Sequence, residues 1–118
     1  MQSNTTEIII IQKTYKLYLS LHATIVKIPK ISRFSLGARI ETIALDILEK
    51  LYEASAKHGN ARLMILEQMD TKLKILQTLI RALYDMKDIN DKKFLDLSES
   101  AIEIGRMLGG WIKTAKSK

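Results

Sequence analysis

Residues 28–48 read Ile-Pro-Lys-Ile-Ser-Arg-Phe-Ser-Leu-Gly-Ala-Arg-Ile-Glu-Thr-Ile-Ala-Leu-Asp-Ile-Leu, and they contain the only proline of the chain, Pro29. Proline lacks a backbone N–H and disfavours helical geometry in the residue before it, so a first helix must end near Ile28. Ser35 stands directly before apolar residues at helical spacing, and serine is a preferred helix N-cap. This stretch therefore predicts a turn after which a second helix folds back on the first.

Apolar residues recur at helical spacing on both sides of this turn, and they predict helices over residues 5–28, 36–58, 61–86 and 91–115. Gly59 is expected to close the second helix in a left-handed conformation, Asn60 to cap the third and Asn90 to cap the fourth. Short connections between helices of this length predict an all-α fold, an antiparallel up-down-up-down four-helix bundle forming one domain over residues 1–118. The expected inner stripes of the last three helices are Ile40, Ile43, Ala44, Ile47, Leu51 and Ala54; Leu66, Met69, Leu73, Leu76, Ile80 and Leu83; and Phe94, Leu97, Ala101, Ile104, Leu108 and Trp111.

The first predicted helix is apolar on more than one side. Residues such as Ile10, Leu17 and Leu21 lie outside its expected inner stripe, and one seam of a bundle cannot bury both sets. The surplus predicts a second contact surface, most simply with other copies of the chain in a ring-like homo-oligomer. The expected inner stripe of this helix is Ile8, Ile11, Tyr15, Tyr18, His22 and Ile25.

The composition limits the class of protein. The 118 residues are 47% hydrophobic and include no cysteine, which suits a helical domain and excludes disulfide bonds and thiolate zinc sites. No apolar run approaches the length of a membrane span, and the first residues lack the basic segment of a signal peptide. A soluble, cytoplasmic protein that does not enter a membrane is therefore expected.

Residues suited to catalysis are sparse. The two histidines are His22, expected in the core or at an interface rather than as a ligand or base, and His58, expected at a helix end. No glycine loop for phosphate and no His-Glu metal spacing occurs, and acid pairs such as Glu49 and Glu53 lack a histidine partner. The sequence predicts that the protein is not an enzyme and has no catalytic residue, metal site, cofactor or small-molecule substrate.

Most of the net charge of +6 lies before residue 41, where six Lys and Arg accompany a single Glu. A basic chain of this size points to a polyanionic partner, although such charges can also simply solvate helix faces. The candidate nucleic-acid-binding residues are Lys27, Lys30, Arg33 and Arg39 around the first turn, Lys13 and Lys16 on the outer side of the preceding helix, and Lys74 and Arg81 on the third helix.

Two alternatives remain open for this assignment. Arg33 and Arg39 could pair with acids such as Glu41 or Asp46 and brace the turn instead of contacting phosphate. The nucleic-acid surface could also lie elsewhere, on Lys92, Arg106 and residues 113–118.

The segment Ile104-Gly-Arg-Met-Leu-Gly-Gly-Trp-Ile112 places three glycines inside the last predicted helix. Each glycine costs roughly 1 kcal/mol relative to alanine, so a packing reason is expected. Gly105 and Gly109 lie four residues apart and are expected to let another helix approach closely, so that Gly109→Leu would overpack the bundle. Trp111 continues the apolar stripe and is expected in the core rather than as a platform for stacking bases.

Two stretches carry a family resemblance. Pro29-Lys-Ile-Ser-Arg-Phe-Ser-Leu-Gly-Ala-Arg-Ile40, with Thr42-Ile-Ala-Leu-Asp-Ile-Leu-Glu49 after it, resembles the segment between the first two helices of the accessory variability determinant (Avd) proteins of diversity-generating retroelements. The segment from Ile104 to Ile112 resembles their C-terminal motif. Four-helix proteins encoded in 23S rRNA intervening sequences share the bundle and part of the first pattern. Ala38 departs from the Avd pattern, which often has glutamine there.

The resemblance implies a basic, barrel-like homopentamer. It implies binding to the retroelement reverse transcriptase and to the template RNA or its cDNA, in support of mutagenic reverse transcription and without catalytic activity of its own. The alternative is a structural or rRNA-associated four-helix protein with no reverse transcriptase partner. A reverse transcriptase gene and paired template and variable repeats beside this gene would separate the two.

Overall fold

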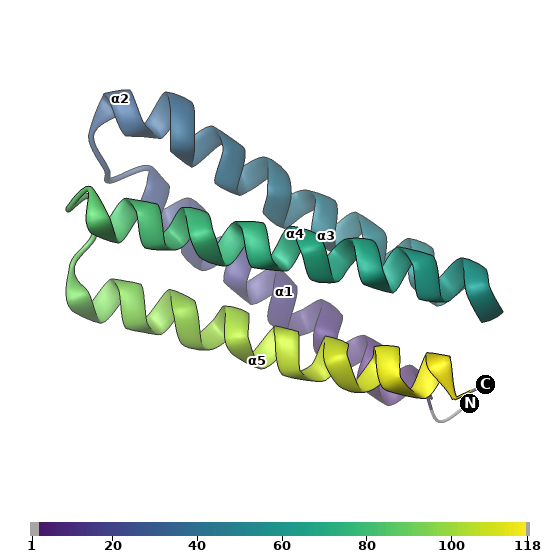
Figure 1. Cartoon of the computed structure of the whole chain (residues 1–118). Coiled ribbons are helices and arrows are strands. Elements are labelled where there is room, and N and C mark those ends of the chain that lie inside the picture. Colours follow the sequence, from purple (N-terminus) through teal and green to yellow (C-terminus); the bar gives the residue numbers. More distant parts are fainter. Residues whose placement is uncertain (1–2, 118) are drawn as a thin grey trace.

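The computed structural model describes residues 3–117, with side chains from residue 5 onward. Over this part of the chain it contains helices and no strand, which confirms the all-α prediction (Figure 1). Four long helices account for most of the residues, and a short helical segment precedes the second of them. The elements are α1 (Ser3–Ile25), α2 (Lys30–Ser32), the π-helical turn η1 (Arg33–Gly37), α3 (Ala38–Ala56), α4 (Gly59–Asp85) and α5 (Asp91–Lys116).

The four long helices lie side by side along a body of 46 × 22 × 19 Å (Figure 1). Each packs against two neighbours, in the cyclic order α1, α3, α4, α5. The connection from α1 to α2 and the connection from α4 to α5 lie at one end of the body, and the connection from α3 to α4 lies at the other. In this cyclic order, the α1–α3 pair and the α4–α5 pair form opposite sides of the bundle.

The core lies along the middle of the four helices. The stripes predicted for α3 and α4 are buried at every position, and that of α5 is buried from Leu97 to Trp111, with Phe94 partly covered. Full burial of one Leu or Ile side chain stabilises the folded state by roughly 1.5–3 kcal/mol, so these stripes supply most of the driving force for folding.

The predicted inner stripe of α1 is wrong. Its buried apolar side chains are Ile10, Leu17, Leu21 and Ile25, of which only Ile25 belonged to the expected set. Three polar residues, Glu7, Thr14 and Thr24, occupy positions on the buried side, and they make this side less apolar in sequence than the one that faces solvent. The residues of the expected stripe lie at the margin of the buried side of α1 or on its solvent-facing side. Much of their apolar surface is therefore exposed.

The predicted start of the second helix at Ser35 is also wrong. Helical geometry begins at Lys30, directly after Pro29, whose carbonyl accepts the N–H of Arg33 at 2.9 Å. Proline is tolerated at a helix start because its missing N–H would have no helical partner there. Ser35 lies inside η1, and its hydroxyl donates to the Ile31 carbonyl at 2.8 Å. Because η1 joins α2 to α3 without a break, the second long helix covers residues 30–56 and is about one turn longer than the predicted helix over residues 36–58.

Gly37 ends η1 at a point of close contact with α1. It is buried, and a Cβ added there would lie 2.8 Å from Cγ2 of Ile25 and 3.4 Å from the carbonyl oxygen of Ser32. Contacts that short require a neighbour to move, and the branched Ile25 side chain is itself buried. Glycine thus allows η1 to rest directly on the end of α1.

The predicted ends of the remaining helices are partly confirmed. Asn90 caps α5 as expected, since its side chain accepts the N–H of Lys93 at 2.8 Å. Gly59 has the expected left-handed backbone, with φ +59°, but it opens α4 instead of closing the helix before it. Asn60 is therefore not the N-cap, which is His58.

The glycines of α5 differ in their surroundings. A Cβ at Gly105 would lie 3.3 Å from Cδ2 of Leu73 on α4, which is a close helix contact. At Gly109 and Gly110 an added Cβ meets no atom within 4 Å. The expected close packing at Gly109 is therefore not found inside the bundle, and the expectation that Gly109→Leu overpacks it is wrong for the single chain.

We expect Gly110→Ala to raise the free energy of unfolding by roughly 0.5–1 kcal/mol, because alanine has the higher helix propensity and its methyl group has open space. Urea unfolding followed by circular dichroism measures the change. Gly105→Ala is the matched control and should gain less, because its methyl group must displace Leu73. A less stable Gly110→Ala protein would mean that a second chain covers this position.

Candidate nucleic-acid interface

Four cations surround the connection between α1 and α3, and we refer to Lys27, Lys30, Arg33 and Arg39 as the basic turn. Lys27, Lys30 and Arg39 are exposed. No ion pair between these three residues and a carboxylate occurs in residues 5–117. Because residues 8–40 contain no Asp or Glu, the positive charge of this turn is not offset locally along the chain.

Arg33 has a different environment from the other three. Its side chain is half-buried, and Nη2 donates to the Ile28 carbonyl at 3.3 Å, across the turn that Pro29 creates. Nε is buried without a hydrogen-bond partner among the described residues, and the guanidinium carbon lies 5.9 Å from the centre of the Phe34 ring. Arg33 thus holds the turn together while it adds charge to the surface.

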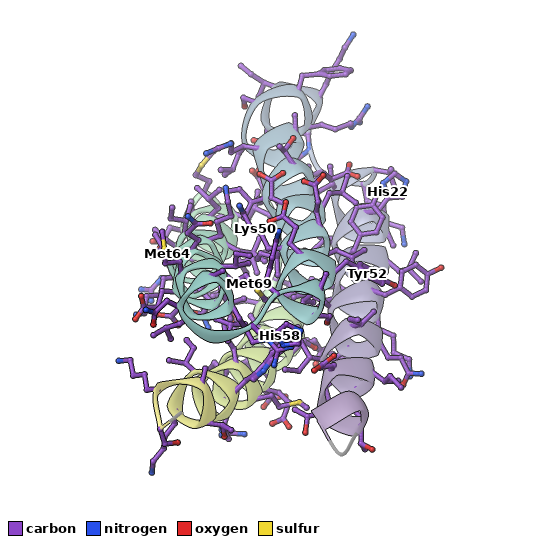
Figure 2. All side chains as sticks on the ribbon, turned by 90° about the vertical axis from the view of Figure 1, so that its right-hand side faces the viewer. His22, Lys50, Tyr52, His58, Met64 and Met69 are labelled. Carbon is purple, nitrogen blue, oxygen red and sulfur yellow. The ribbon has the colours of Figure 1, made fainter. Side chains whose placement is uncertain are left out.

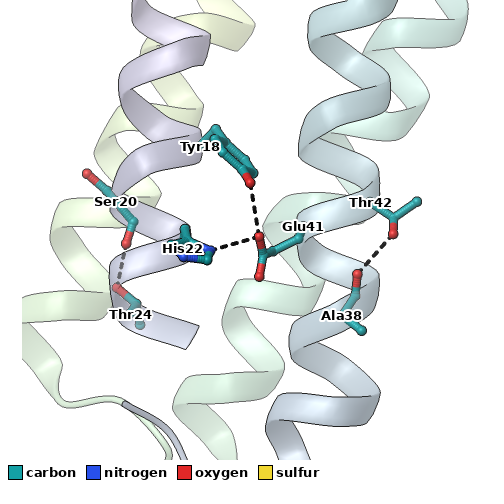
Figure 3. A network of polar contacts seen from close by, with 7 residues as sticks. All are labelled: Tyr18, Ser20, His22, Thr24, Ala38, Glu41 and Thr42. Atoms are coloured by element: carbon teal, nitrogen blue, oxygen red, sulfur yellow. Dashed lines mark hydrogen bonds and ion pairs between the residues drawn. The ribbon is translucent and has the colours of Figure 1, made fainter. Parts of the chain in front are cut away.

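The alternative in which Arg33 and Arg39 pair with Glu41 or Asp46 is wrong in its ion pairs, since none of them occurs among the described residues. Arg33 does brace the turn, but through its bond to the Ile28 carbonyl. Glu41 accepts the Tyr18 hydroxyl at 3.2 Å and lies 3.0 Å from Nδ1 of His22, which links α1 to α3 (Figure 3).

Asp46 instead pairs with Lys72 of α4 at 3.3 Å.

The hydrogen bond that Tyr18 donates to Glu41 raises the pKa of Tyr18 above its ordinary value. His22 is an exposed residue that bonds from α1 to Glu41 of α3. A core position for His22 is therefore wrong, whereas a position at an interface stays a prediction.

Lys13 and Lys16 lie on the side of α1 that faces α5. They line a shallow cavity of about 310 Å³ together with Glu99 and Glu103 of α5. The two glutamates reduce the positive potential there. Lys13 and Lys16 are separated from the basic turn by more than two helical turns of α1, so the structure does not bring the two groups together.

Lys74 and Arg81 form an exposed stripe on α4, as their spacing of seven predicts, but both are paired. Lys74 lies 2.7 Å from Asp70, and Arg81 lies 2.9 Å from Asp85. The hydrogen bond to Asp85 raises the pKa of Arg81 above its ordinary value. Since each cation pairs with an acid one turn away, the net positive charge with which this stripe could attract a phosphate group is small.

The fold also brings together cations that the sequence did not connect. Lys27, two residues after the end of α1, lines a cavity of about 340 Å³ with Lys92 and Lys93, from the first turn of α5. Lys93 was not a candidate, and no sequence signal joins it to Lys27, because only the packing of α5 beside α1 makes them neighbours. Asp88 and Asp96 line the same cavity, and Asp96 pairs with Lys92 at 3.4 Å, so the charge there is mixed.

Exposed apolar side chains gather on the outer side of α1 and α3, and we call this the α1–α3 face. Tyr15 and Leu19 of α1 are 52% and 46% exposed, and Tyr52 of α3 is 61% exposed. Tyr52 and His22 point to the same side of the molecule in Figure 2. The members of the α1–α3 face are Ile8, Tyr15 and Leu19 of α1, Val26 directly after α1, and Leu45 and Tyr52 of α3.

Three further predictions concern the core position of Trp111, metal binding and membrane spans. Trp111 is buried, which confirms its place in the core, and the guanidinium of Arg62 lies 5.6 Å from its ring centre. Over the described residues no group of three or more His, Cys, Asp or Glu side chains could hold a metal ion. Within the same residues no helix combines the length and hydrophobicity required to span a membrane.

The comparison with known families agrees with this organisation. No curated protein matches the chain in sequence. A family model described as bAvd-like matches residues 8–115, which include the basic turn, the α1–α3 face and the three glycines of α5. The match confirms the resemblance to Avd proteins that residues 29–49 and 104–112 indicate. The chain belongs to the bAvd-like family.

Proposed function

We propose that the chain is a non-catalytic accessory protein of a diversity-generating retroelement. In this role it binds the template RNA or its cDNA, and the retroelement reverse transcriptase, in the cytoplasm. Membership of the bAvd-like family supports the accessory role. The basic turn is the observation that carries nucleic-acid binding, because Lys27, Lys30 and Arg39 are exposed cations without an ion-pair partner among the described residues.

Two other basic groups contribute less to this proposal. Lys74 and Arg81 already have carboxylate partners, and a phosphate would have to displace them. Lys13 and Lys16 lie beside two glutamates. The basic turn therefore provides the main contacts, and the other candidates provide secondary ones.

We further propose that the chain, as an up-down-up-down bundle, assembles into a ring-like homopentamer. A closed ring uses two different surfaces of each subunit, in a head-to-tail contact. The α1–α3 face supplies one apolar surface. The second is a stripe on α5, which we call the α5 stripe, formed by Leu95, Ile102 and Gly109 at intervals of seven residues.

The position of the α5 stripe suits such a contact. Gly105, one turn from Ile102, touches Leu73 of α4, whereas Glu99 lies toward α1, so the stripe is on the α4 side of α5. It is therefore on the opposite side of the bundle from the α1–α3 face. Gly109 would let a neighbouring helix approach closely, which gives a reason for a glycine that has none inside the single chain.

We expect the variant Lys30/Arg39→Ala to bind RNA more weakly and with a smaller salt dependence. Removal of one phosphate contact should flatten the slope of log affinity against log salt by roughly 0.7 to 0.9, since fewer counterions are released. A ring repeats each contact, and multivalency therefore magnifies the decrease in affinity. Fluorescence anisotropy with a labelled RNA across a salt series measures both effects.

Lys74/Arg81→Ala is the matched control, because it removes the same charge from residues that are already paired. It should change the affinity and the slope much less. Equal effects from both variants would mean that only total charge matters. A normal affinity and slope for Lys30/Arg39→Ala would place the interface away from the basic turn, with Lys92, Arg106 and residues 113–117 as the next surface to test.

The partner enzyme separates this proposal from the alternative of a structural or rRNA-associated four-helix protein. Co-expression with a reverse transcriptase encoded beside the gene should yield a complex that survives purification. If no such gene or complex exists and the chain binds ribosomal RNA instead, the alternative holds.

A further inference from the structure

The two most exposed large apolar side chains of the described residues lie next to each other in the basic turn. Ile31 is 83% exposed and Phe34 is 69% exposed. They are three residues apart, which places them on one side of the helical segment formed by α2 and η1. Such exposure of a large aromatic ring is costly in water, and neither the core nor the α1–α3 face accounts for it.

The backbone that carries Phe34 is held in place at both ends. Before it, Arg33 donates to the Ile28 carbonyl at 3.3 Å. After it, Gly37 rests against Ile25 so closely that there is no room for a Cβ. The π-helical turn between these two points departs from the regular α-helical spacing, and such turns occur frequently at functional sites. The phenyl ring is thus presented to solvent from a rigid support.

The ring is also polarised on one side. The guanidinium of Arg33 lies over it at 5.9 Å from the ring centre, which is within the range of a cation–π contact. Since the side chain remains mostly exposed, the ring can receive a second planar group. An unpaired base fits this position, because every base has a flat π-surface and stacks on aromatic side chains.

The charges around Phe34 favour a nucleic acid over an apolar protein segment. Lys30 lies one turn before Phe34, and Arg39 lies beyond η1 on the same helical segment. Both are exposed, and no acidic residue occurs between residues 8 and 40. A single strand that stacks one base on Phe34 carries phosphates on both sides of that base, where these cations can neutralise them.

We propose that Phe34 is a stacking platform for an unpaired base of single-stranded nucleic acid, with Lys30 and Arg39 on the flanking phosphates. This inference rests on the proposed nucleic-acid binding and adds to it a preference for single strands over duplexes. A base paired within a duplex is stacked on its neighbours and cannot cover the ring without first being unstacked.

Binding of a short, unstructured RNA tests the proposal, with a duplex of the same length for comparison. Phe34→Ala should weaken single-strand binding by roughly fivefold to a hundredfold, the usual range for loss of one stacked base, and leave duplex binding nearly unchanged. Phe34→Leu should behave like Phe34→Ala, because it keeps an apolar side chain without a π-surface, whereas Phe34→Trp should restore binding.

Ile31→Ala is the matched control, since it removes exposed apolar surface at the neighbouring position without removing a ring. It should leave the affinity within about twofold of the unmodified chain, which is far below the stacking range. A fluorescent purine analogue in the RNA provides a second readout, because its emission is quenched when it stacks on Phe34. Each variant is checked for helix content and for assembly.

The outcomes separate this inference from the proposed function. If the unmodified chain binds no RNA at low salt, both fail. If it binds RNA but Phe34→Leu binds and quenches equally well, stacking is overturned while binding through the basic turn stands. If Ile31→Ala loses as much affinity as Phe34→Ala, stacking is again overturned, and the pair is an apolar contact surface for a protein.

Discussion

Leu19→Asp is expected to reduce the particle from five times the chain mass of 13.5 kDa to the mass of one chain. Leu19 lies in the α1–α3 face and is 46% exposed in the single chain. In the proposed ring a neighbouring subunit covers it. Burial of an unpaired carboxylate costs several kcal/mol, and the ring would repeat that cost at every interface. Multi-angle light scattering after size-exclusion chromatography measures the mass.

The matched control is Ile75→Asp, which introduces the same charge at an exposed position of α4 outside both proposed surfaces. It should leave the mass of the particle unchanged. Circular dichroism should show the helix content of the unmodified chain for both variants, since neither residue belongs to the core. A Leu19→Asp protein that kept the full mass would exclude the α1–α3 face from the assembly.

Cross-linking can identify the surface that meets Leu19, because the chain has no cysteine of its own. In a head-to-tail ring, the double variant Leu19→Cys/Ile102→Cys should form disulfide bonds between neighbouring chains and give a ladder of multimers. Leu19→Cys alone should remain uncross-linked. If the single variant forms dimers efficiently, the α1–α3 face pairs with itself around a two-fold axis and the head-to-tail ring is wrong.

Gly37→Ala is expected to lower the free energy of unfolding by roughly 1–2 kcal/mol. The added methyl group would lie 2.8 Å from Cγ2 of Ile25, and overpacking of this kind typically costs about 1–3 kcal/mol. The better helix propensity of alanine offsets up to about 1 kcal/mol of that cost. Chemical unfolding followed by circular dichroism gives the difference.

The contrast with Gly110→Ala makes this test specific, because the same substitution should stabilise an open position of α5 and destabilise a closed position at Gly37. Ile25→Val provides no relief, since valine keeps a methyl group at the same branch. If Gly37→Ala were as stable as the unmodified chain, η1 would have enough freedom to move away from α1, and the rigid support proposed for Phe34 would be lost as well.

The sequence predicted the buried stripes of three of the four long helices closely, and the reason is physical. In α3, α4 and α5 the apolar residues form a single stripe and polar residues cover the other sides, so only one orientation can bury them. The stripes that include Leu51, Leu73 and Ile104 were all correct. Asn90 was also predictable, because an N-cap depends on residues close to it in sequence.

The prediction of the buried side of the first helix was wrong because this helix is apolar on two sides. The buried side contains Thr14 and Thr24, whereas the exposed side contains Ile8, Tyr15 and Leu19. Judged by hydrophobicity alone, the exposed side is the better candidate for the core. A residue pattern in one chain does not distinguish surface buried within the bundle from surface suited to a second chain, and this accounts for the error.

The candidate site was predictable in its charge but not in its pairing. The absence of acids from residues 8–40 located the basic turn. Whether a given cation is free depends on neighbours contributed by other helices or other turns, as with Lys72 and Asp46, and spacing alone cannot supply this. Gly37 was overlooked for the same reason, since its closest neighbour is a side chain of α1.

The placement of the connections gives each subunit a direction. The basic turn and the start of α5 lie at one end of the long axis, whereas α1 begins and α5 ends at the other (Figure 1). Cyclic symmetry cannot invert a subunit, so every copy in a ring points the same way. The proposed pentamer therefore has two chemically different rims. One would gather the cations of the basic turn and the Phe34 rings, and the other would keep its surface available for a protein that approaches from the opposite side.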